Sequence, residues 1–307
     1  MIKAHHDYFL ELSNMDKVEK IFIGSANFGE NYGAIVEGNV LTEQSIKMLL
    51  YKAIESPNLF IDTANSYKNS EYLIGKYAAQ KLNNKIMTKV HISKSDNYKS
   101  IVNLIKSSLG LVQQDIFFSV LVHNADVFTG DNSDEIVSAL EDCKSSGLTQ
   151  NIGVSCYEAN EITFISSKYD SISDFQIPEN ITDQRNLNNK NFRDLHKSGK
   201  SLYIRSVFLQ GSLLIDPSRL PHFFSPELEV FENFRQSCKA NKISSLKACL
   251  DYVRSIEWKA GLVIGVQSYN QLNEILNEIS NPIKINTFSN QVLSSQLVDP
   301  RNWRRDQ

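Results

Sequence analysis

The sequence predicts an α/β fold in which eight parallel strands, each followed by a helix, close into a barrel. Short, continuously apolar segments alternate eight times with segments of helical periodicity, and this order indicates a parallel sheet covered by helices. The chain has 307 residues. One barrel needs about 250 residues, which leaves room for loops and a tail. No linker interrupts the alternation, so we expect residues 1–307 to form a single (β/α)8 TIM barrel domain.

A doubly wound open sheet is the structural alternative to the barrel. Such a sheet would carry a glycine-rich G-x-G-x-x-G turn after its first strand, where the turn binds a phosphate. Gly24, Gly29 and Gly33 stand in this region but lack that spacing. The sequence therefore favours the barrel.

The N-terminal half of the chain provides the first four strands and their helices. Residues 1–19 are polar and mixed, and we expect them to form a short hairpin or cap at the bottom of the barrel. Thr42 precedes apolar residues at helical spacing and is expected to cap the first barrel helix. Gly147 is expected to end the fourth. The expected strands are residues 21–24, 59–62, 85–89 and 117–123, and the expected helices are residues 42–54, 69–80, 96–109 and 133–146.

The C-terminal half repeats the alternation and ends in a tail, residues 282–307. A polar loop is expected at residues 180–191, and the helix after it ends near residue 199. The remaining expected strands are residues 151–155, 171–178, 202–206 and 261–266, and the remaining expected helices are residues 159–167, 226–241, 244–257 and 269–279.

Composition and charge argue against several classes of protein. The net charge is −3 and no stretch is strongly basic, so a nucleic acid is not an expected partner. The N-terminus lacks the apolar core of a signal peptide, and no run approaches the roughly 20 apolar residues of a membrane helix. The four cysteines are widely spaced, as is typical of free thiols in the reducing cytoplasm. His5, His6 and Asp7 have no Cys or His cluster beside them, so no metal site is expected.

Four chemically active side chains stand at or just after the ends of successive strands. Asp62 ends the second expected strand and Tyr67 follows on its loop, while Lys89 and His123 end the third and fourth. Active sites of α/β barrels are built from the carboxyl ends of the strands and the loops that follow them. A buried carboxylate needs a partner, and Lys89 is the candidate for Asp62.

Together with four further motifs, these residues resemble the aldo-keto reductase superfamily over nearly the whole chain. Members of that superfamily use an Asp, a Tyr, a Lys and a His in this order, and Asp62, Tyr67, Lys89 and His123 match them. The resemblance implies that these four are catalytic, that the chain is an NAD(P)H-dependent enzyme acting on an aldehyde or ketone, and that the tail folds over the barrel mouth. The motifs are IGSANFG at residues 23–29, IGVSCYE at 152–158, RSVFLQGSLL at 205–214 and VIGVQSYNQLNEIL at 263–276.

Reduction of a carbonyl group to the alcohol requires a hydride and a proton. No side chain supplies a hydride, so a nicotinamide cofactor is implied. A free tyrosine has a pKa of about 10, and we expect the Lys89 ammonium to lower the pKa of Tyr67 so that Tyr67 acts as general acid. Asp62 would hold Lys89 charged and oriented, and His123 would hydrogen-bond the carbonyl oxygen or assist the proton relay.

The resemblance also implies a set of residues that bind NADP(H) or NAD(H). Ser155 and Gln176 match positions that bind the nicotinamide carboxamide, and backbone amides from Phe208 onward would face the diphosphate. Arg205 stands where relatives often carry an aromatic residue, and its planar guanidinium can stack on the nicotinamide or pair with an acid of the substrate or a loop. The expected cofactor-binding residues are Ser155, Gln176, Arg205, Ser206, Phe208, Gly211, Ser268, Gln271 and Glu274.

Two departures from the family's pattern concern the cofactor. Cys156 follows Ser155, where relatives often carry an Asn, and a thiol cannot form the amide pair. No Lys or Arg occurs between Gly265 and Leu276, where many relatives bind the 2′-phosphate of NADP. The choice between NADP(H) and NAD(H) is therefore open. The resemblance also implies that Glu274 meets the adenine amino group.

Substrate specificity is expected from loops at the barrel mouth. The mixture of loop residues there is polar, which favours a small sugar-derived aldehyde or ketone as the substrate. The residues expected to contact it are Phe28, Tyr32, Asn124 and Trp303.

Two alternative functions belong to other classes of protein. A regulatory subunit of the same fold would bind the nicotinamide with little turnover. An unrelated barrel lyase or isomerase would use Lys89 as a Schiff-base amine, which the carboxylate of Asp62 beside it disfavours. The sequence leaves the oligomeric state open.

Overall fold

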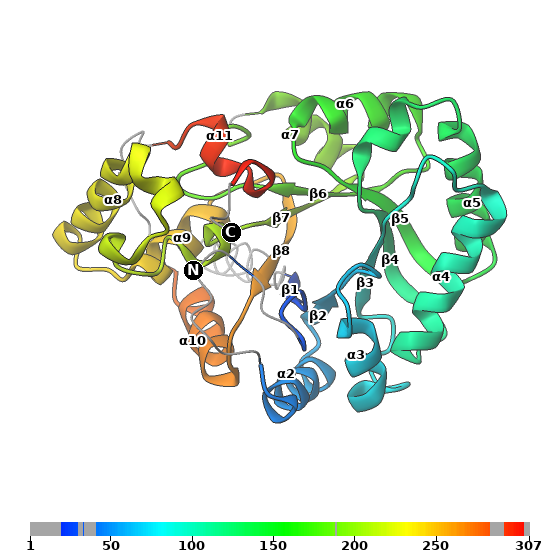
Figure 1. The fold of residues 1–307 in the computed structure, drawn as a ribbon, viewed down its shortest axis with the longest axis horizontal. Helices are drawn as coiled ribbons and strands as arrows, with labels where there is room; N and C mark the ends of the chain where they lie inside the picture. Colours follow the sequence, from blue (N-terminus) through cyan, green and yellow to red (C-terminus); the bar gives the residue numbers. More distant parts are fainter. Residues whose placement is uncertain (1–19, 30–32, 34–40, 188, 283–291, 304–307) are drawn as a thin grey trace, which may run out of the picture.

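The eight expected strands form a closed barrel in which neighbouring strands are parallel and follow one another in chain order (Figure 1). The computed structural model describes residues 20–29, 33, 41–187, 189–282 and 292–303. The strands are β1 Lys20–Gly24, β2 Leu59–Asp62, β3 Ile86–Val90, β4 Phe117–Val122, β5 Thr149–Ser155, β6 Asp174–Pro178, β7 Ser201–Arg205 and β8 Lys259–Gly265. Strand β1 pairs with both β2 and β8, which closes the barrel. The α/β barrel expected from the sequence is confirmed.

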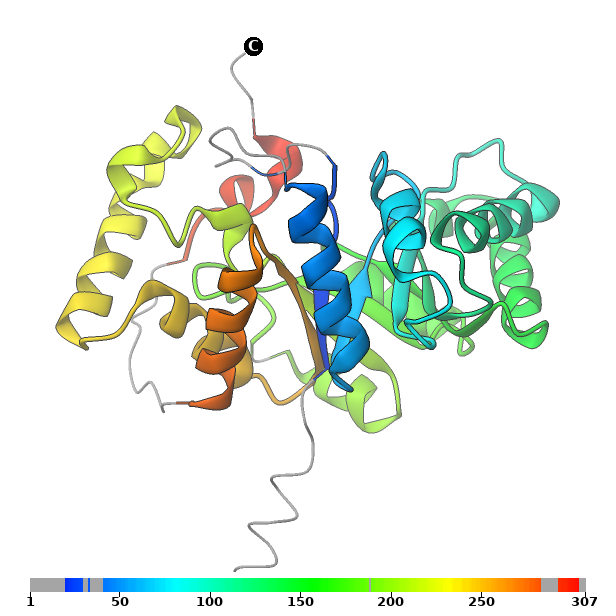
Figure 2. The same ribbon diagram turned by 90° about the horizontal axis from the view of Figure 1, so that it is seen from below.

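Helices surround the barrel on its outside (Figures 1 and 2). The α-helices are α2 Glu43–Glu55, α3 Ser70–Ala78, α4 Tyr98–Val112, α5 Ser133–Ser145, α6 Ala159–Lys168, α7 Lys190–Lys197, α8 Leu228–Ala240, α9 Ser245–Arg254, α10 Tyr269–Ser280 and α11 Ser295–Val298. Short 3-10 helices are η1 Ala125–Thr129, η2 Leu209–Gly211, η3 Pro217–Arg219, η4 His222–Glu227 and η5 Pro300–Asn302. Helices α2 and α10 lie side by side, one after β1 and the other after β8.

Local signals in the sequence set several helix ends. The Thr42 side chain accepts a hydrogen bond from the backbone of Ser45 and caps α2 as expected. Gly147 has a φ of 76° just after α5, a left-handed conformation that glycine adopts easily. Asn97 caps α4, which therefore begins two residues later than expected. Pro226 lies in η4, and α8 begins only after it, at Leu228.

A layer of apolar side chains fills the interior of the barrel. The layer is separate from the main core and comes only from strands. The Phe22 ring lies at its centre, 5.0 Å from Phe60 and 5.2 Å from Tyr203 between ring centroids. The layer consists of Phe22, Phe60, Met87, Phe118, Leu121, Tyr203 and Val263.

Polar residues continue the inward face of several strands beyond this layer. Side chains of a strand alternate between its two faces, so residues two positions apart point to the same side. Each of three polar side chains follows an apolar member of the layer by two positions and therefore lies inside the barrel, nearer its carboxyl end. The pairs are Phe60 and Asp62, Met87 and Lys89, and Tyr203 and Arg205.

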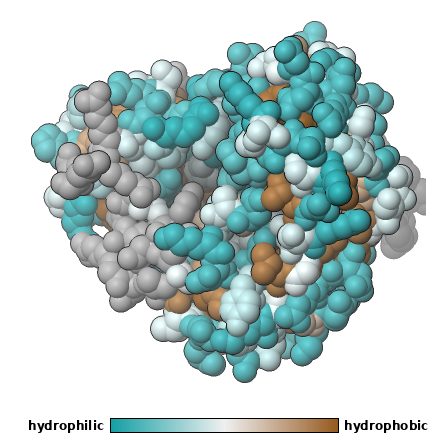
Figure 3. All heavy atoms as spheres, turned by 45° about the vertical axis from the view of Figure 1, so that its right-hand side comes forward, coloured by the Kyte–Doolittle hydropathy of each residue, from teal (hydrophilic) through white to brown (hydrophobic). Residues whose placement is uncertain are grey.

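The main apolar core lies between the strands and the helices outside them. On α2, for example, Ile46, Leu49 and Leu50 are buried in this core. Among the coloured residues of the face shown in Figure 3, hydrophilic ones predominate and apolar ones lie between them in several places. In the part of the chain that the structure describes, no helix has both the length and the apolar character needed to cross a membrane.

The sequence predicts a cap at the N-terminus and a tail over the barrel mouth at the C-terminus, and the structure describes only part of the tail. The expected cap, residues 1–19, lies outside the described residues. The described part of the tail, residues 292–303, meets the barrel mouth, because the Arg301 guanidinium lies 3.6 Å from the centre of the Tyr157 ring just after β5. Trp303 stacks on Phe223 of η4, with ring centroids 5.1 Å apart. This segment therefore lies beside the carboxyl ends of the strands.

Candidate active site

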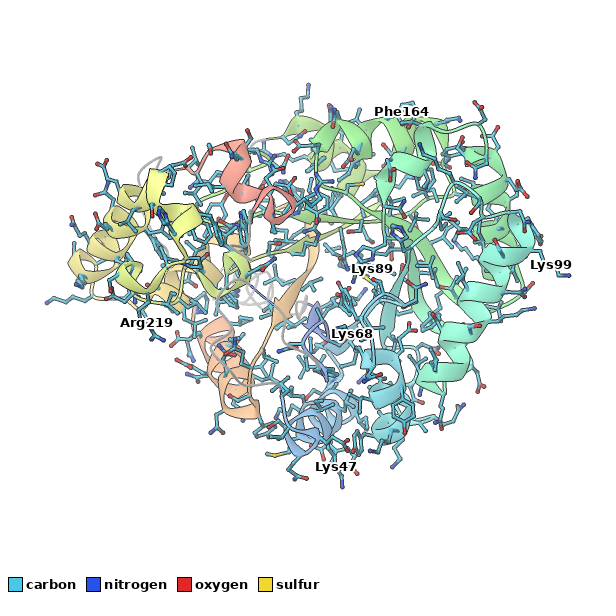
Figure 4. All side chains as sticks on the ribbon, viewed as in Figure 1. Lys47, Lys68, Lys89, Lys99, Phe164 and Arg219 are labelled. Carbon is cyan, nitrogen blue, oxygen red and sulfur yellow. The ribbon has the colours of Figure 1, made fainter. Side chains whose placement is uncertain are left out.

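Asp62 and Lys89 form a buried ion pair at the carboxyl ends of β2 and β3. The Lys89 Nζ donates to both carboxylate oxygens of Asp62, over 2.7 and 2.6 Å. Lys89 lies within the ring of strands (Figure 4). The two side chains are only 2% and 5% exposed. Buried charges need such partners. The pairing of Asp62 with Lys89 that the sequence predicts is present in the structure.

The side chains of Asp62, Tyr67, Lys89 and His123 line one cavity of about 290 Å³. The rings of Tyr67 and His123 meet edge to face, with centroids 5.9 Å apart. The Lys89 Nζ lies 5.3 Å from the centre of the Tyr67 ring. The structure thus brings together the four side chains that the sequence singles out. Within the described residues, no group of three or more His, Cys, Asp or Glu is placed to hold a metal ion.

The Tyr67 phenol holds its proton more tightly than a free tyrosine does. Burial raises the pKa of Tyr67 well above its ordinary value, the negative charge of Asp62 raises it further, and the charge of Arg205 opposes the rise. The expected lowering of this pKa by Lys89 is therefore wrong for the structure as it stands. The main reason is that the phenol is buried, and the negative charge of Asp62, to which Lys89 is bound, adds to the rise.

His123 is an uncharged imidazole at neutral pH. Burial lowers the pKa of His123 to about 3, and the positive charges of Lys89 and Arg205 act in the same direction. The Oγ of Ser66 lies 3.3 Å from its Nδ1. A neutral imidazole donates a hydrogen bond from one ring nitrogen and accepts one at the other.

Six of the nine residues expected to bind the cofactor line the cavity, and three do not. Ser268 caps α10 by accepting from the Gln271 backbone over 3.1 Å. Glu274 is exposed on the same helix. Gln176 lies behind the cavity, fully buried. The six that line it are Ser155, Arg205, Ser206, Phe208, Gly211 and Gln271.

Gln176 on β6 supports Asp62 and keeps one atom unpaired. Its Nε2 donates to the Asp62 Oδ1 over 2.6 Å, while its Oε1 has no hydrogen-bond partner among the described residues. A buried acceptor without a partner is unusual. The unpaired oxygen suits an amide N–H₂ group such as that of a nicotinamide carboxamide.

The loop after β7 holds backbone conformations that are uncommon outside glycine. Ser206, Leu209 and Gln210 have φ values of 61°, 46° and 51°. Non-glycine residues in this region are uncommon and cluster at functional sites. Right- and left-handed residues in succession form a concavity of N–H groups that binds anions. The residues present therefore fit the diphosphate of a dinucleotide.

Tyr157 lines the cavity although it is not among the residues expected there. The guanidinium carbon of Arg205 lies 4.2 Å from its ring centre and that of Arg301 lies 3.6 Å from it. Two cations so close to one ring centre occupy opposite faces, because on one face they would collide. The only signal in the sequence is its place two residues after Ser155, at a strand end.

Three residues expected to contact the substrate do not line this cavity. Phe28 is fully buried in the main core. The Asn124 amide binds both backbone groups of Ile92, over 3.1 and 3.0 Å. Trp303 packs on the aromatic residues of η4. Their positions therefore do not support direct contact with a substrate. Tyr32 lies outside the described residues.

Comparisons with known proteins agree with this architecture. The sequence profile of the Aldo/keto reductase family matches residues 20–291. A search of curated proteins finds no match. A solved aldo-keto reductase from Bacillus halodurans, in its holo form, is 19% identical with a TM-score of 0.68, over 91% of this chain and 90% of that one. The thermostable aldo-keto reductase Tm1743, solved with the inhibitor epalrestat, is 19% identical with a TM-score of 0.66, over 91% and 92%. At this identity the two structures show a shared fold.

Proposed function

Since the chain belongs to the aldo/keto reductase family, we propose that it reduces an aldehyde or ketone to the alcohol with NADP(H) or NAD(H). The observation that carries this proposal is the convergence of Tyr67, His123 and the Asp62–Lys89 pair on one cavity. A bound nicotinamide supplies the hydride. The side chains of the cavity have to hold the carbonyl group and deliver a proton to its oxygen.

Tyr67 is the proposed proton donor. Its raised pKa keeps the phenol protonated at neutral pH. A proton held this tightly passes only to a strong base, and the oxygen of a carbonyl becomes one as it gains a hydride. Lys89, 5.3 Å from the ring centre, would stabilise the phenolate that remains. Asp62 holds the ammonium of Lys89 in this position.

His123 is proposed to orient the substrate. Because its imidazole is uncharged at neutral pH, it has no extra proton to give up in the reaction. It can still donate a hydrogen bond to the carbonyl oxygen, where negative charge develops. The edge-to-face contact with Tyr67 holds the two rings at one place in the cavity.

The cofactor would lie along the cavity from Ser155 to Gln271. Ser155 and the unpaired Oε1 of Gln176 are the proposed partners of the carboxamide. The loop of residues 206–211 would hold the diphosphate. The Gln271 Oε1 accepts from the backbone of Gln267 over 2.7 Å, and no cation other than Lys89 and Arg205 lines the described cavity. Weak discrimination between NADPH and NADH follows.

The lining of the cavity supports a polar substrate, and a sugar-derived carbonyl compound is the proposed class. Besides the four central residues, polar groups converge from several loops, and such groups fix the orientation of a ligand. Hydroxyl groups on the substrate would find donors and acceptors there. The polar residues are Asn27, Ser155, Tyr157, Ser206, Gln210, Gln267 and Gln271.

Incubation of the purified protein with NADPH or NADH and a panel of aldehydes and ketones tests the proposal. The expected result is oxidation of the cofactor that depends on the carbonyl compound and disappears in Tyr67→Phe. If both cofactors bind but neither is consumed with any compound, the chain is a nicotinamide-binding protein and the proposed reduction is wrong.

A further inference from the structure

Arg205 contributes a positive charge to the cavity that no described carboxylate neutralises. The ionised side chains that line the described cavity are Asp62, Lys89 and Arg205. Asp62 and Lys89 pair with each other. The described hydrogen bonds of the Arg205 guanidinium go to neutral oxygens, those of Cys156 and Ser206. The described cavity therefore carries a net positive charge at Arg205.

The carboxylate of Asp299, on which the charge of Arg205 acts, already forms an ion pair with another residue, Arg301. Burial opposes ionisation of Asp299, but hydrogen bonds from Arg301 lower its pKa, and the positive charge of Arg205 adds a smaller effect. Both oxygens of Asp299 accept hydrogen bonds from Arg301, over 3.0 Å from its Nε and 2.6 Å from its Nη2. Such a fork is the preferred geometry of a guanidinium and a carboxylate. Asp299 thus neutralises Arg301 and leaves Arg205 for another anion.

Several donors of the Arg205 guanidinium are still available. Its Nη2 donates to the Cys156 carbonyl over 3.1 Å, and its Nη1 lies at the longer distance of 3.4 Å from the Ser206 Oγ. Its Nε has no hydrogen-bond partner among the described residues but is buried, so the donors counted for a ligand are the remaining N–H groups of Nη1 and Nη2. A guanidinium has more N–H groups than these contacts use. The edge of the group can therefore bind two acceptor oxygens.

The guanidinium is also held in place before any ligand arrives. Its carbon lies 4.2 Å from the centre of the Tyr157 ring, and Arg301 covers the other face of that ring. Stacking on an aromatic face uses the plane of the guanidinium and leaves its edges free for hydrogen bonds. A donor that is already ordered loses less entropy when it binds.

Arg205 is close enough to the proposed reacting groups to serve the same ligand. Its charge acts on the pKa of Tyr67 and on the pKa of His123, and all three line one cavity. A small molecule with its carbonyl group at Tyr67 would therefore bring a second group within reach of Arg205.

We propose that Arg205 binds an anionic group of the substrate, a carboxylate or a phosphate, so that the enzyme selects acidic carbonyl compounds. This inference rests on the proposed carbonyl reduction and specifies the class of its substrate. Arg205 acts as a specificity residue: its guanidinium forms a charge-assisted, two-pronged contact with the anion and fixes the distance to the carbonyl.

The first test compares acidic carbonyl compounds with neutral counterparts. The pairs are succinic semialdehyde with butanal, glyoxylate with glycolaldehyde, and dihydroxyacetone phosphate with dihydroxyacetone. The parent should favour at least one acid in kcat/KM by about tenfold to a hundredfold, the contribution of one or two charged hydrogen bonds. A preference within either of the first two pairs indicates a carboxylate site, and a preference within the third pair indicates a phosphate site. If no acid is favoured over its neutral counterpart, the proposal is wrong.

Three variants assign the preference to Arg205. Arg205→Gln should bring the ratio of kcat/KM for the acid to kcat/KM for its neutral counterpart close to one. The ratio is the readout, because the loss of the Arg205 charge at Tyr67 and His123 affects both compounds alike. Arg205→Lys keeps the charge and should restore part of the preference. Lys99→Gln removes a positive charge from the exposed surface of α4 (Figure 4) and should change nothing. A preference that survives in Arg205→Gln overturns the proposal.

Binding without turnover separates this proposal from the proposed reduction. Isothermal titration with succinate, malonate and inorganic phosphate needs no reaction, and succinamide is the neutral control. If one of these anions binds the parent and not Arg205→Gln while no carbonyl compound is reduced, the anion site stands and the proposed reduction fails. If the compounds are reduced but no anion binds and no acid is favoured, the reduction stands and the anion site fails.

The diphosphate of the cofactor is a second source of negative charge. Titration of NADPH and NADH into the parent and into Arg205→Gln distinguishes it from the substrate. The expected result is that the variant loses the preference for the acid by a larger factor than it loses cofactor affinity. A loss of cofactor affinity of tenfold or more, with the preference among carbonyl compounds unchanged, would assign the charge to the cofactor and overturn the proposal.

Discussion

Lys89 donates a hydrogen bond to each carboxylate oxygen of Asp62, inside a barrel where both side chains are almost fully buried. The pair has two effects on the site. It keeps an ammonium next to the Tyr67 ring, and it adds a carboxylate whose charge raises the pKa of that phenol. Whether the phenol gives up its proton therefore depends on what else enters the cavity.

Tyr67→Phe should leave cofactor binding intact and lower turnover by at least about 100-fold, the lower end of what a positioned acid contributes. The phenyl ring retains the edge contact with His123 and loses only the hydroxyl. Fluorescence titration measures cofactor binding, and steady-state kinetics measure turnover. Tyr72→Phe is the matched control, because Tyr72 is 53% exposed on α3. Equal turnover in parent and Tyr67→Phe would show that another group is the acid.

Lys89→Met should abolish activity and lower the free energy of unfolding by about 3–5 kcal/mol, because it leaves the buried Asp62 charge without its cation. The measurement is urea denaturation followed by circular dichroism.

The double variant Lys89→Met with Asp62→Asn removes both charges and should regain most of that stability but no activity. Gln176 can still donate to the Asn side chain. Full activity in the single variant, or a covalent substrate adduct on Lys89 after borohydride treatment, would contradict the assigned role of Lys89.

His123 should not titrate between about pH 5 and pH 8, the range in which an ordinary histidine changes charge. Burial and nearby cations lower its pKa to about 3. The check is an NMR titration of the imidazole, with the signal assigned by its absence in His123→Asn. An apparent pKa near the ordinary value of 6.5 would show that the imidazole is more accessible than the structure indicates.

The same lowered pKa has a consequence for stability. Below about pH 6.5 the unfolded chain protonates His123 and the folded chain does not, so His123 contributes a loss of stability as the pH falls toward 3. His123→Asn should remove this part of the acid sensitivity.

Glu179, just after β6, should make the folded state less stable as the pH rises from about 5 to about 8. Burial raises the pKa of Glu179 from 4.5 to about 8, and the charge of Asp183 adds to the rise. Between these values the folded chain keeps a proton that the unfolded chain has lost, so unfolding is favoured by at most about 1.4 kcal/mol per pH unit.

Thermal or urea unfolding of Glu179→Gln across this range checks the effect. The variant should show a flatter stability profile than the parent, since its side chain does not ionise. Glu257→Gln, at an exposed position, is the control and should follow the parent. Parallel profiles for the parent and Glu179→Gln would contradict the prediction.

The parent should bind NADPH and NADH with dissociation constants within about tenfold of each other. A cation on the 2′-phosphate would contribute roughly 1.5–3 kcal/mol per charged hydrogen bond, and the α10 end of the described cavity offers only Gln267 and Gln271. Gln271→Arg should tighten NADPH relative to NADH by about tenfold or more.

Gln271→Arg also removes the acceptor for the Gln267 backbone, a cost that both cofactors share and that cancels in their ratio. Gln271→Met removes the same acceptor without adding charge and serves as the control. A preference of the parent for NADPH above about a hundredfold would mean that a basic residue reaches the phosphate from elsewhere in the chain.

Most of what could be predicted came from the periodicity of apolar residues along the chain. The eight strands and the ends where Asp62, Lys89 and His123 stand follow from apolar runs and the residues that stop them, and these are local properties. The positions of Phe28 and Trp303 could not be predicted in this way, because loop side chains follow no fixed alternation. Both are buried against distant aromatic and aliphatic residues rather than facing the cavity.

Electrostatic properties were the least predictable part of the site. The pKa of Tyr67 depends on how deeply the phenol is buried and on the opposing charges of Asp62 and Arg205, and neither is a property of one segment. The contacts of Tyr157 could not be predicted from one segment either, because the two cations on its ring come from β7 and from the tail. Contacts between residues so far apart in the chain are fixed only when the barrel closes.

Asp62, Lys89 and Arg205 each follow an inward-facing residue of the apolar layer by two positions. They face the barrel interior only while the number of residues within each strand stays the same. Met87 and Lys89 face inward together, so a deletion of one residue within β3 would turn the ammonium out among the helices and bring a threonine or valine to its place. A deletion in the loop after the strand would leave the inward face unchanged. Variation in length is therefore tolerated after the last residue of each strand and not before it, which places the segments whose length can change directly beside those whose length cannot.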